Sequence, residues 1–184
     1  MRLIFHVHSS GDFINLPDNI SNKFRKIIIR RNTRGFELDI HTEHFENSID
    51  SIRSLFDLQM ISFPNSIERS FEIEGTLDRN RMVELLKFSE SLMLQERFWE
   101  SHIIMENLWK SSVGNRRSYF QGLILLSASM VQHQMGNLTK SKEIYQRSYL
   151  LIKSSGINSN LLSKIPINFS YPIALNYESM LPDK

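Results

Sequence analysis

The sequence predicts an α+β protein, in which a small antiparallel sheet with one helix precedes an all-α bundle of two helical hairpins. In the first 75 residues, short runs alternate between apolar and polar side chains, as in half-buried strands. After residue 76, apolar residues recur every three or four positions, as in amphipathic helices. We therefore expect domains at residues 1–75 and 76–156, followed by an extended C-terminal arm at residues 157–184.

Composition narrows the class of protein. The 184 residues include no cysteine, which excludes disulfides and thiolate zinc sites. The net charge of +2 is too small to favour nucleic acid or an anionic membrane on its own. The apolar run near the N-terminus is short for a signal peptide, and no stretch approaches the roughly 20 apolar residues of a membrane span. We expect a cytoplasmic protein that does not contact membranes.

The N-terminal domain is predicted to begin with a half-buried strand at residues 2–8. Two further strands, at residues 26–31 and 36–41, form a hairpin whose turn places Gly35 at the position that needs positive φ. A helix with its apolar stripe between residues 45 and 56 follows, with Thr42 as its N-cap. Short strands are expected at residues 60–63 and 67–73.

The C-terminal domain is predicted to contain four helices, at residues 77–94, 96–112, 116–135 and 138–154. Gly114 and Gly136 stand where glycines end helices. The third helix is apolar nearly all round, so we expect it at the buried centre. Three prolines after residue 165 exclude a regular helix there and favour an extended arm.

The second of these helices contains FWESHIIMENLW, residues 98–109. On a helical wheel, one stripe collects the aromatic residues together with His102 and Glu106, which lie one turn apart. We expect this stripe to face the core. Because a buried polar group without a partner costs roughly 1–3 kcal/mol, the pair predicts a site or a fixed hydrogen bond.

Several motifs in this region occur in a characteristic order. They are His102, Glu106 and Trp109 in the pattern His-x3-Glu-x2-Trp, then Gln121-Gly122, then Gly136-Asn137. Over about residues 89–153 the chain resembles domain-of-unknown-function family 309. This resemblance implies a core of helical hairpins similar to tetratricopeptide pairs and a metal-binding role for the histidine and glutamate. Family members commonly carry glutamate directly after the motif histidine, where this chain has Ile103, so a full metal shell is less expected.

Three interpretations of the His102–Glu106 pair remain open: a structural hydrogen bond, a ligand or metal site, and acid–base catalysis. A zinc site needs three or four ligands. His133 is the nearest further ligand, and Trp99, Trp109 and Gln121 could support the site. However, His133 and Gln121 lie about 120° apart on their helix, so they are not both expected to face His102.

Two further clusters lie in the N-terminal domain. His6 and His8 could share a sheet face with Glu37, Asp39 and His41 and hold a metal, or they could simply form its solvated face. A basic hairpin could contact nucleic-acid phosphates, or it could protect a sheet edge from aggregation; its cations are Lys26, Arg30, Arg31 and Arg34.

The leading functional prediction is an interaction or ligand-binding module with a buried His-Glu-Trp cluster and a protein as its partner. One alternative is a hydrolase-type enzyme that uses a divalent metal at this cluster. The other is nucleic-acid binding through the basic hairpin. The sequence leaves open whether the protein is an enzyme.

Overall fold

The computed structural model describes residues 1–9, 16, 22, 24–64 and 78–157. The chain divides into two compact units, Met1–Ser66 and Ile67–Lys184. The strand predicted at residues 67–73 lies outside the described residues, as does all of the predicted C-terminal arm except Ile157.

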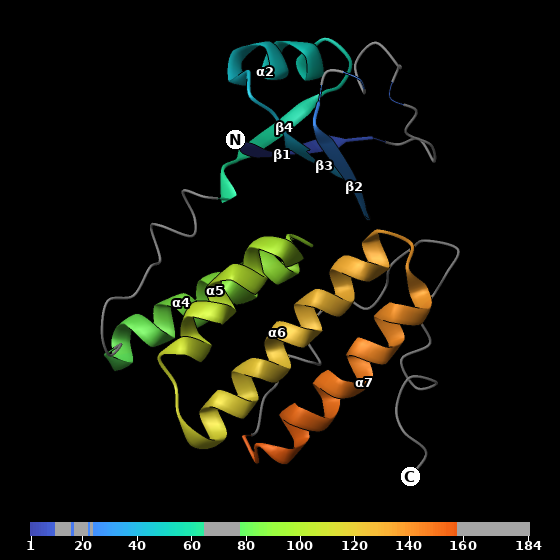
Figure 1. Cartoon of the computed structure of the whole chain (residues 1–184). Helices are drawn as coiled ribbons and strands as arrows, with labels where there is room; N and C mark the ends of the chain where they lie inside the picture. The colour runs from blue at the N-terminus through green and yellow to red at the C-terminus, as the bar shows by residue number, and fades with distance from the viewer. Residues whose placement is uncertain (10–15, 17–21, 23, 65–77, 158–184) are drawn as a thin grey trace. The chain divides into compact units, whose positions relative to one another are not determined.

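The described part of the N-terminal unit is a four-stranded sheet with one helix (Figure 1). The strands lie in the order β2-β3-β1-β4, and each neighbouring pair is antiparallel. This confirms the predicted α+β class. The elements are β1 (Arg2–His8), β2 (Lys26–Asn32), β3 (Gly35–His41), α2 (Phe45–Arg53) and β4 (Leu58–Ser62).

One face of the sheet forms the core of this unit. The side chains that the alternation assigned to it are buried, and Ile52 of α2 joins them. The opposite face differs from the prediction of a half-buried first strand, because Ile4 and His6 are buried as well. Its polar side chains are paired with one another, which allows burial without loss of hydrogen bonds. The core residues are Leu3, Phe5, Val7, Phe36, Leu38, Ile40 and Ile52.

The turn between β2 and β3 is as predicted. Asn32 pairs with Gly35, so Thr33 and Arg34 form a two-residue loop. Gly35 has a φ of +153°, which L-residues rarely adopt. This short loop fixes the register of the whole hairpin.

The predicted N-cap of α2 is wrong by two residues. The N-cap position is His44, whose side chain makes no capping hydrogen bond. Thr42 instead accepts a hydrogen bond from the backbone N–H of His44 at 3.1 Å, and its Oγ1 lies 2.8 Å from the Ser48 hydroxyl. Its hydroxyl therefore shapes the turn that leads into α2.

The described residues of the C-terminal unit form four helices, which confirms the predicted helical class. They are α4 (Arg79–Leu94), α5 (Phe98–Lys110), α6 (Gly114–Gln134) and α7 (Leu138–Ser154). Each helix packs on the next, so α6 contacts both α5 and α7 (Figure 1). None of the helices in the described ranges has the length and apolar content that crossing a membrane requires.

The two hairpins of this unit repeat one design at a spacing of 40 residues. In the first hairpin, the hydroxyls of Ser89 and Ser101 lie 2.7 Å apart between α4 and α5. In the second, Ser129 and Ser141 form the equivalent pair between α6 and α7, at 3.1 Å. Such short hydroxyl side chains let the paired helices approach closely.

The glycines at the helix ends differ in role. Gly136 has a φ of +79° and donates its N–H to the His133 carbonyl, while the N–H of Asn137 bonds to Gln132, so α6 ends in a Schellman motif as predicted. The prediction for Gly114 is wrong, because Ser111 is the C-cap of α5 and Gly114 begins α6. At the end of α4, Glu96 adopts the left-handed conformation that Gly136 adopts in the second hairpin.

Candidate functional site

His102 and Glu106 form a pair on the outer side of α5. The distance from His102 Nε2 to Glu106 Oε1 is 3.3 Å, and the side chains are 19% and 47% exposed. The pair is therefore not buried as predicted, although Trp99 and Trp109 pack against the core. The buried arc of α5 includes Leu108, which lies about 160° around the helix from Glu106.

The imidazole of His102 is held on two sides. Its Nδ1 lies 3.2 Å from the backbone carbonyl of Ile124 in α6. Because a carbonyl only accepts, Nδ1 carries the proton in this hydrogen bond, and Nε2 is left facing Glu106. The indole of Trp99 stacks on the ring, with centroids 5.7 Å apart and an angle of 11° between the planes.

Whether this contact is favourable depends on what lies between the two groups. When the imidazole is neutral, Nε2 and the carboxylate are both acceptors, so their contact becomes favourable only when a proton, a cation or a donor lies between them. Two ligands at about 2.0–2.1 Å from a tetrahedral ion lie about 3.3–3.4 Å apart, which matches the observed pair. In the described part of the chain, no third imidazole or carboxylate joins His102 and Glu106 in a group suited to a metal.

The other residues predicted for this site are only partly brought together. His133 lies nine residues beyond Ile124, or about 13 Å along α6, so it is not beside His102. Burial lowers the pKa of His133, which favours its neutral form. Gln121 is exposed on α6. The backbone carbonyl of Ile124, and not the side chain of Gln121, supports the pair by its contact with His102.

Trp109 occupies the end of the same side of α5. It is partly buried, and the guanidinium of Arg117 lies over its ring, 4.2 Å from the centroid. We call the partly exposed residues Trp99, His102, Glu106 and Trp109 the α5 stripe. The sequence pattern singled out these four residues but assigned them to the core.

Comparison with known proteins identifies part of the helical unit. Residues 87–144 match the family model of the Domain of unknown function (DUF309). The DUF309 match includes the whole α5 stripe and lies in the C-terminal part of the chain, as the motifs predicted. No curated protein and no solved structure matches the chain.

Within the DUF309 match, Gly122 has a clear packing role. It is buried in α6, where the Ser148 hydroxyl of α7 donates to its carbonyl at 2.8 Å. A Cβ at this position would lie 2.5 Å from Cγ1 of Ile152 and 3.1 Å from the backbone N of the same residue. The Gln-Gly motif therefore marks a close approach of α6 and α7.

We expect Gly122→Ala to destabilise the helical unit by about 1–2 kcal/mol. Overpacking costs roughly 1–3 kcal/mol, and the better helix propensity of alanine offsets up to about 1 kcal/mol of this. Both tryptophans of the chain lie in α5, so urea unfolding followed by tryptophan fluorescence reports on this unit. Gln121→Ala, at the exposed neighbouring position, should change stability by less than about 0.5 kcal/mol. Equal midpoints for the two variants would contradict the packing role.

The basic hairpin does not present its cations on one surface. Arg30 is only 1% exposed and bonds to Glu37 and Asp39, so its predicted contact with nucleic acid is wrong. Alternation along β2 places Arg31 on the opposite face from Arg30. Lys26 and Arg34 are exposed.

Arg30 instead belongs to a charge network across the sheet. Its guanidinium lies 2.8 Å from Glu37 and 2.8 Å from Asp39. Arg2 donates hydrogen bonds to both carboxylate oxygens of Asp39, at 2.8 Å to Oδ1 and 2.6 Å to Oδ2. His6 lies 3.3 Å from Glu37 and 2.9 Å from the Ser62 hydroxyl.

This network only partly matches the predicted His-rich metal cluster. His6, Glu37 and Asp39 share one sheet face, as predicted. However, both carboxylates form ion pairs with arginine guanidiniums. His8 is exposed and lies 3.4 Å from Gln59. Within the N-terminal unit, these contacts favour an ion-pair network.

The network predicts that acid destabilises the sheet. Burial opposes ionisation of Glu37, but the hydrogen bond from His6 and the charge of Arg30 outweigh it and lower the pKa of Glu37 below its ordinary 4.5. Burial likewise opposes ionisation of Asp39, and Arg2 and Arg30 lower the pKa below 3.8. A carboxyl whose pKa is lowered by folding stabilises the fold above its unfolded pKa, and this contribution is lost as the pH falls.

We therefore expect the sheet to lose stability as the pH falls below 4.5 and through the lowered pKa values. Amide exchange of β1 and β3, measured at pH 6 and at about pH 3.5, checks this. Glu37→Gln should flatten the dependence, whereas Glu46→Gln, at an exposed position on α2, should leave it unchanged. Equal pH dependence in both variants would contradict the assignment.

Proposed function

We propose that the helical unit is a binding module that recognises a protein partner through the α5 stripe. The observation that supports this most is the His102–Glu106 pair, in which a fixed imidazole and a carboxylate lie 3.3 Å apart at the surface. A donor from a partner, such as an ammonium or amide N–H group, would satisfy both acceptors at once. The pair is thus suited to a specific polar contact.

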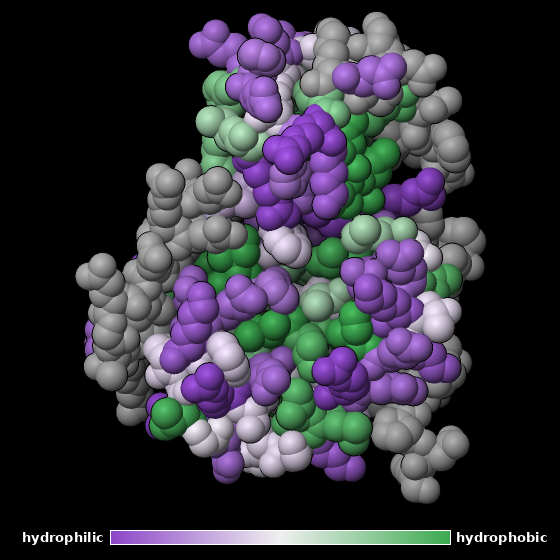
Figure 2. Space-filling view, viewed as in Figure 1, coloured by the Kyte–Doolittle hydropathy of each residue, from purple (hydrophilic) through white to green (hydrophobic). Residues whose placement is uncertain are grey.

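The surroundings of the pair suit an interface. Trp99 and Trp109 flank it, and Arg117 stacks on Trp109. Tryptophan and arginine are enriched among the residues that dominate binding energies. Apolar side chains also reach the surface among polar ones over the helices (Figure 2). We therefore infer that this polar pair, with an aromatic side chain on either side, is the surface that binds the partner.

A divalent metal at the pair is the second candidate, and one contact favours it. Metal-binding histidines usually donate their other ring N–H to a carbonyl or carboxylate, as His102 does to Ile124. His102 and Glu106 would supply two ligands, leaving the remaining positions to water or to a bound partner. Such an ion would act as a Lewis acid, which is the chemistry a hydrolase would use.

The partner proposal is tested by photo-crosslinking in the native host. A photoreactive residue at Lys110, exposed beside Trp109, should give a discrete crosslinked protein, and the same residue at Glu84 on α4 should not. His102→Ala in the Lys110 background should reduce the product roughly tenfold. Absence of a product at Lys110, or a product unaffected by His102→Ala, would contradict the proposal.

Calorimetric titration with Zn²⁺ or Mn²⁺ separates the metal candidate from the partner proposal. Saturable binding to the purified chain that His102→Ala and Glu106→Gln abolish would support it. His133→Ala serves as the control, because His133 is remote from the pair. If metal affinity is absent or the same in all variants, the metal candidate is excluded while the crosslinking result still stands.

A further inference from the structure

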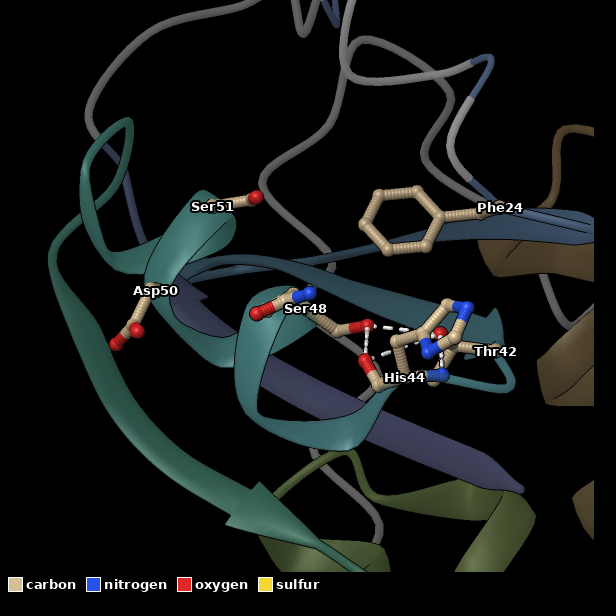
Figure 3. A pocket seen from close by; sticks show the side chains of 7 residues that line it. Phe24, Thr42, His44, Ser48, Asp50 and Ser51 are labelled. Atoms are coloured by element: carbon tan, nitrogen blue, oxygen red, sulfur yellow. Dashed lines mark hydrogen bonds between the residues drawn. The ribbon is translucent and has the colours of Figure 1, made fainter.

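A cavity of about 470 Å³ opens beside the start of α2, within the N-terminal unit (Figure 3). This volume falls in the range of small-molecule sites, about 300–1,000 Å³. Its lining comes from α2, from the turn before it and from the segment before β2. The lining residues are Phe24, Thr42, His44, Asn47, Ser48, Asp50 and Ser51.

The floor of the cavity is rigid because its hydroxyls are already engaged. Thr42 and Ser48 are buried. The Ser48 hydroxyl lies 2.8 Å from Thr42 Oγ1 and 2.5 Å from the His44 carbonyl, to which its single proton can be donated. The backbone N–H of His44 bonds to Thr42 Oγ1 at 3.1 Å. These bonds hold the turn, so ligand contacts fall to the groups above the floor.

The groups above the floor have hydrogen-bonding capacity to spare. Within the described residues, no hydrogen bond or ion pair engages the side chains of His44, Asn47, Asp50 or Ser51. Figure 3 shows the ring of Phe24 opposite the side of α2 that carries Ser48 and Ser51, with the His44 imidazole near Thr42. The cavity thus combines one flat apolar wall with an amide, a hydroxyl and an imidazole, whereas the Asp50 carboxylate points away from Phe24 (Figure 3).

We propose that this cavity binds a neutral saccharide. The C–H face of a sugar ring would pack on Phe24, and its hydroxyls would exchange hydrogen bonds with Asn47 and Ser51. Phosphorylated ligands fit less well, because the lining contains no lysine or arginine and includes the Asp50 carboxylate. A sugar hydroxyl can both donate and accept, which matches the mixed character of the free groups.

The test is an NMR titration of the ¹⁵N-labelled full chain with glucose, galactose, mannose or N-acetylglucosamine, up to about 50 mM. We expect at least one sugar to cause saturable shifts at the amides of Asn47 and Ser51, with a Kd of about 1–10 mM. Asn47→Ala should weaken binding roughly threefold or more. Phe24→Ala should weaken it roughly tenfold. Gln59→Ala, at an exposed position of β4 outside the lining of the cavity, should not change the affinity.

Phe24 also packs against the core, so Phe24→Ala could lose binding by unfolding the N-terminal unit. Asn47→Ala and Phe24→Leu test the proposal independently of that effect. Phe24→Leu keeps an apolar side chain but loses the flat ring, and it should still weaken binding severalfold. The proposal is overturned if no sugar causes saturable shifts, if Asn47→Ala and Gln59→Ala bind equally, or if only inorganic phosphate saturates the cavity.

Discussion

Replacing Arg30 with methionine is expected to lower the free energy of unfolding of the N-terminal unit by roughly 3–5 kcal/mol. Arg30 is almost fully buried and joins Glu37 to Asp39 through two hydrogen bonds of 2.8 Å. Methionine fills a similar volume but leaves the Glu37 carboxylate, which is 1% exposed, without its cation. Asp39 keeps its bidentate contact with Arg2, so the loss falls mainly on Glu37.

The measurement is amide exchange of β1 and β3 at neutral pH, because both tryptophans lie outside this unit. Arg34→Met is the matched control: Arg34 is exposed in the turn, and the loss should stay below about 0.5 kcal/mol. Adding Glu37→Gln to Arg30→Met should restore part of the stability, because it removes the buried charge left behind. A double variant no more stable than Arg30→Met alone would show that the charge of Glu37 is not the cause.

The pairing behind this prediction was available in the sequence. Once the turn is limited to Thr33 and Arg34, the antiparallel register places Arg30 opposite Glu37. Alternation also separates Arg30 from Arg31, so the two cations cannot act on one surface. The prediction of one basic surface was wrong because residues that are neighbours in a strand point to opposite faces of the sheet. The ion pair from Arg2 depends on the β1–β3 register, which no local pattern fixes.

The wrong prediction that the His102–Glu106 pair faces the core has a different cause. The helix at residues 98–109 is apolar over most of its circumference, and a stripe chosen by its aromatic residues does not identify the buried side. Ile104 and Leu108 mark that side, and they lie in the core. The i, i+4 spacing correctly predicted that His102 and Glu106 would meet. The contact with Ile124 could not be predicted, because it depends on how α5 packs on α6.

Gly35→Ala is expected to destabilise the N-terminal unit by roughly 2–5 kcal/mol. The positive φ of Gly35 costs an L-residue about 1–2 kcal/mol, and steric conflict adds about 1–3 kcal/mol. A Cβ would lie 2.0 Å from the backbone carbonyl oxygen of Val7 and 2.8 Å from the backbone N of Ser9. Since both are backbone atoms, no side chain can rotate away, and β1 must separate from β3.

The same amide-exchange experiment separates these contributions. Arg34→Ala, one position earlier in the turn, should leave exchange nearly unchanged. Gly35→Ala should speed exchange most at the Gly35 end of the β1–β3 pair, where Val7 pairs with Phe36 and His8 with Gly35. A smaller effect there than at the Arg2–His41 end would mean that the turn tolerates the added carbon. In that case the register of the hairpin, and with it the pairing of Arg30 with Glu37, would need another explanation.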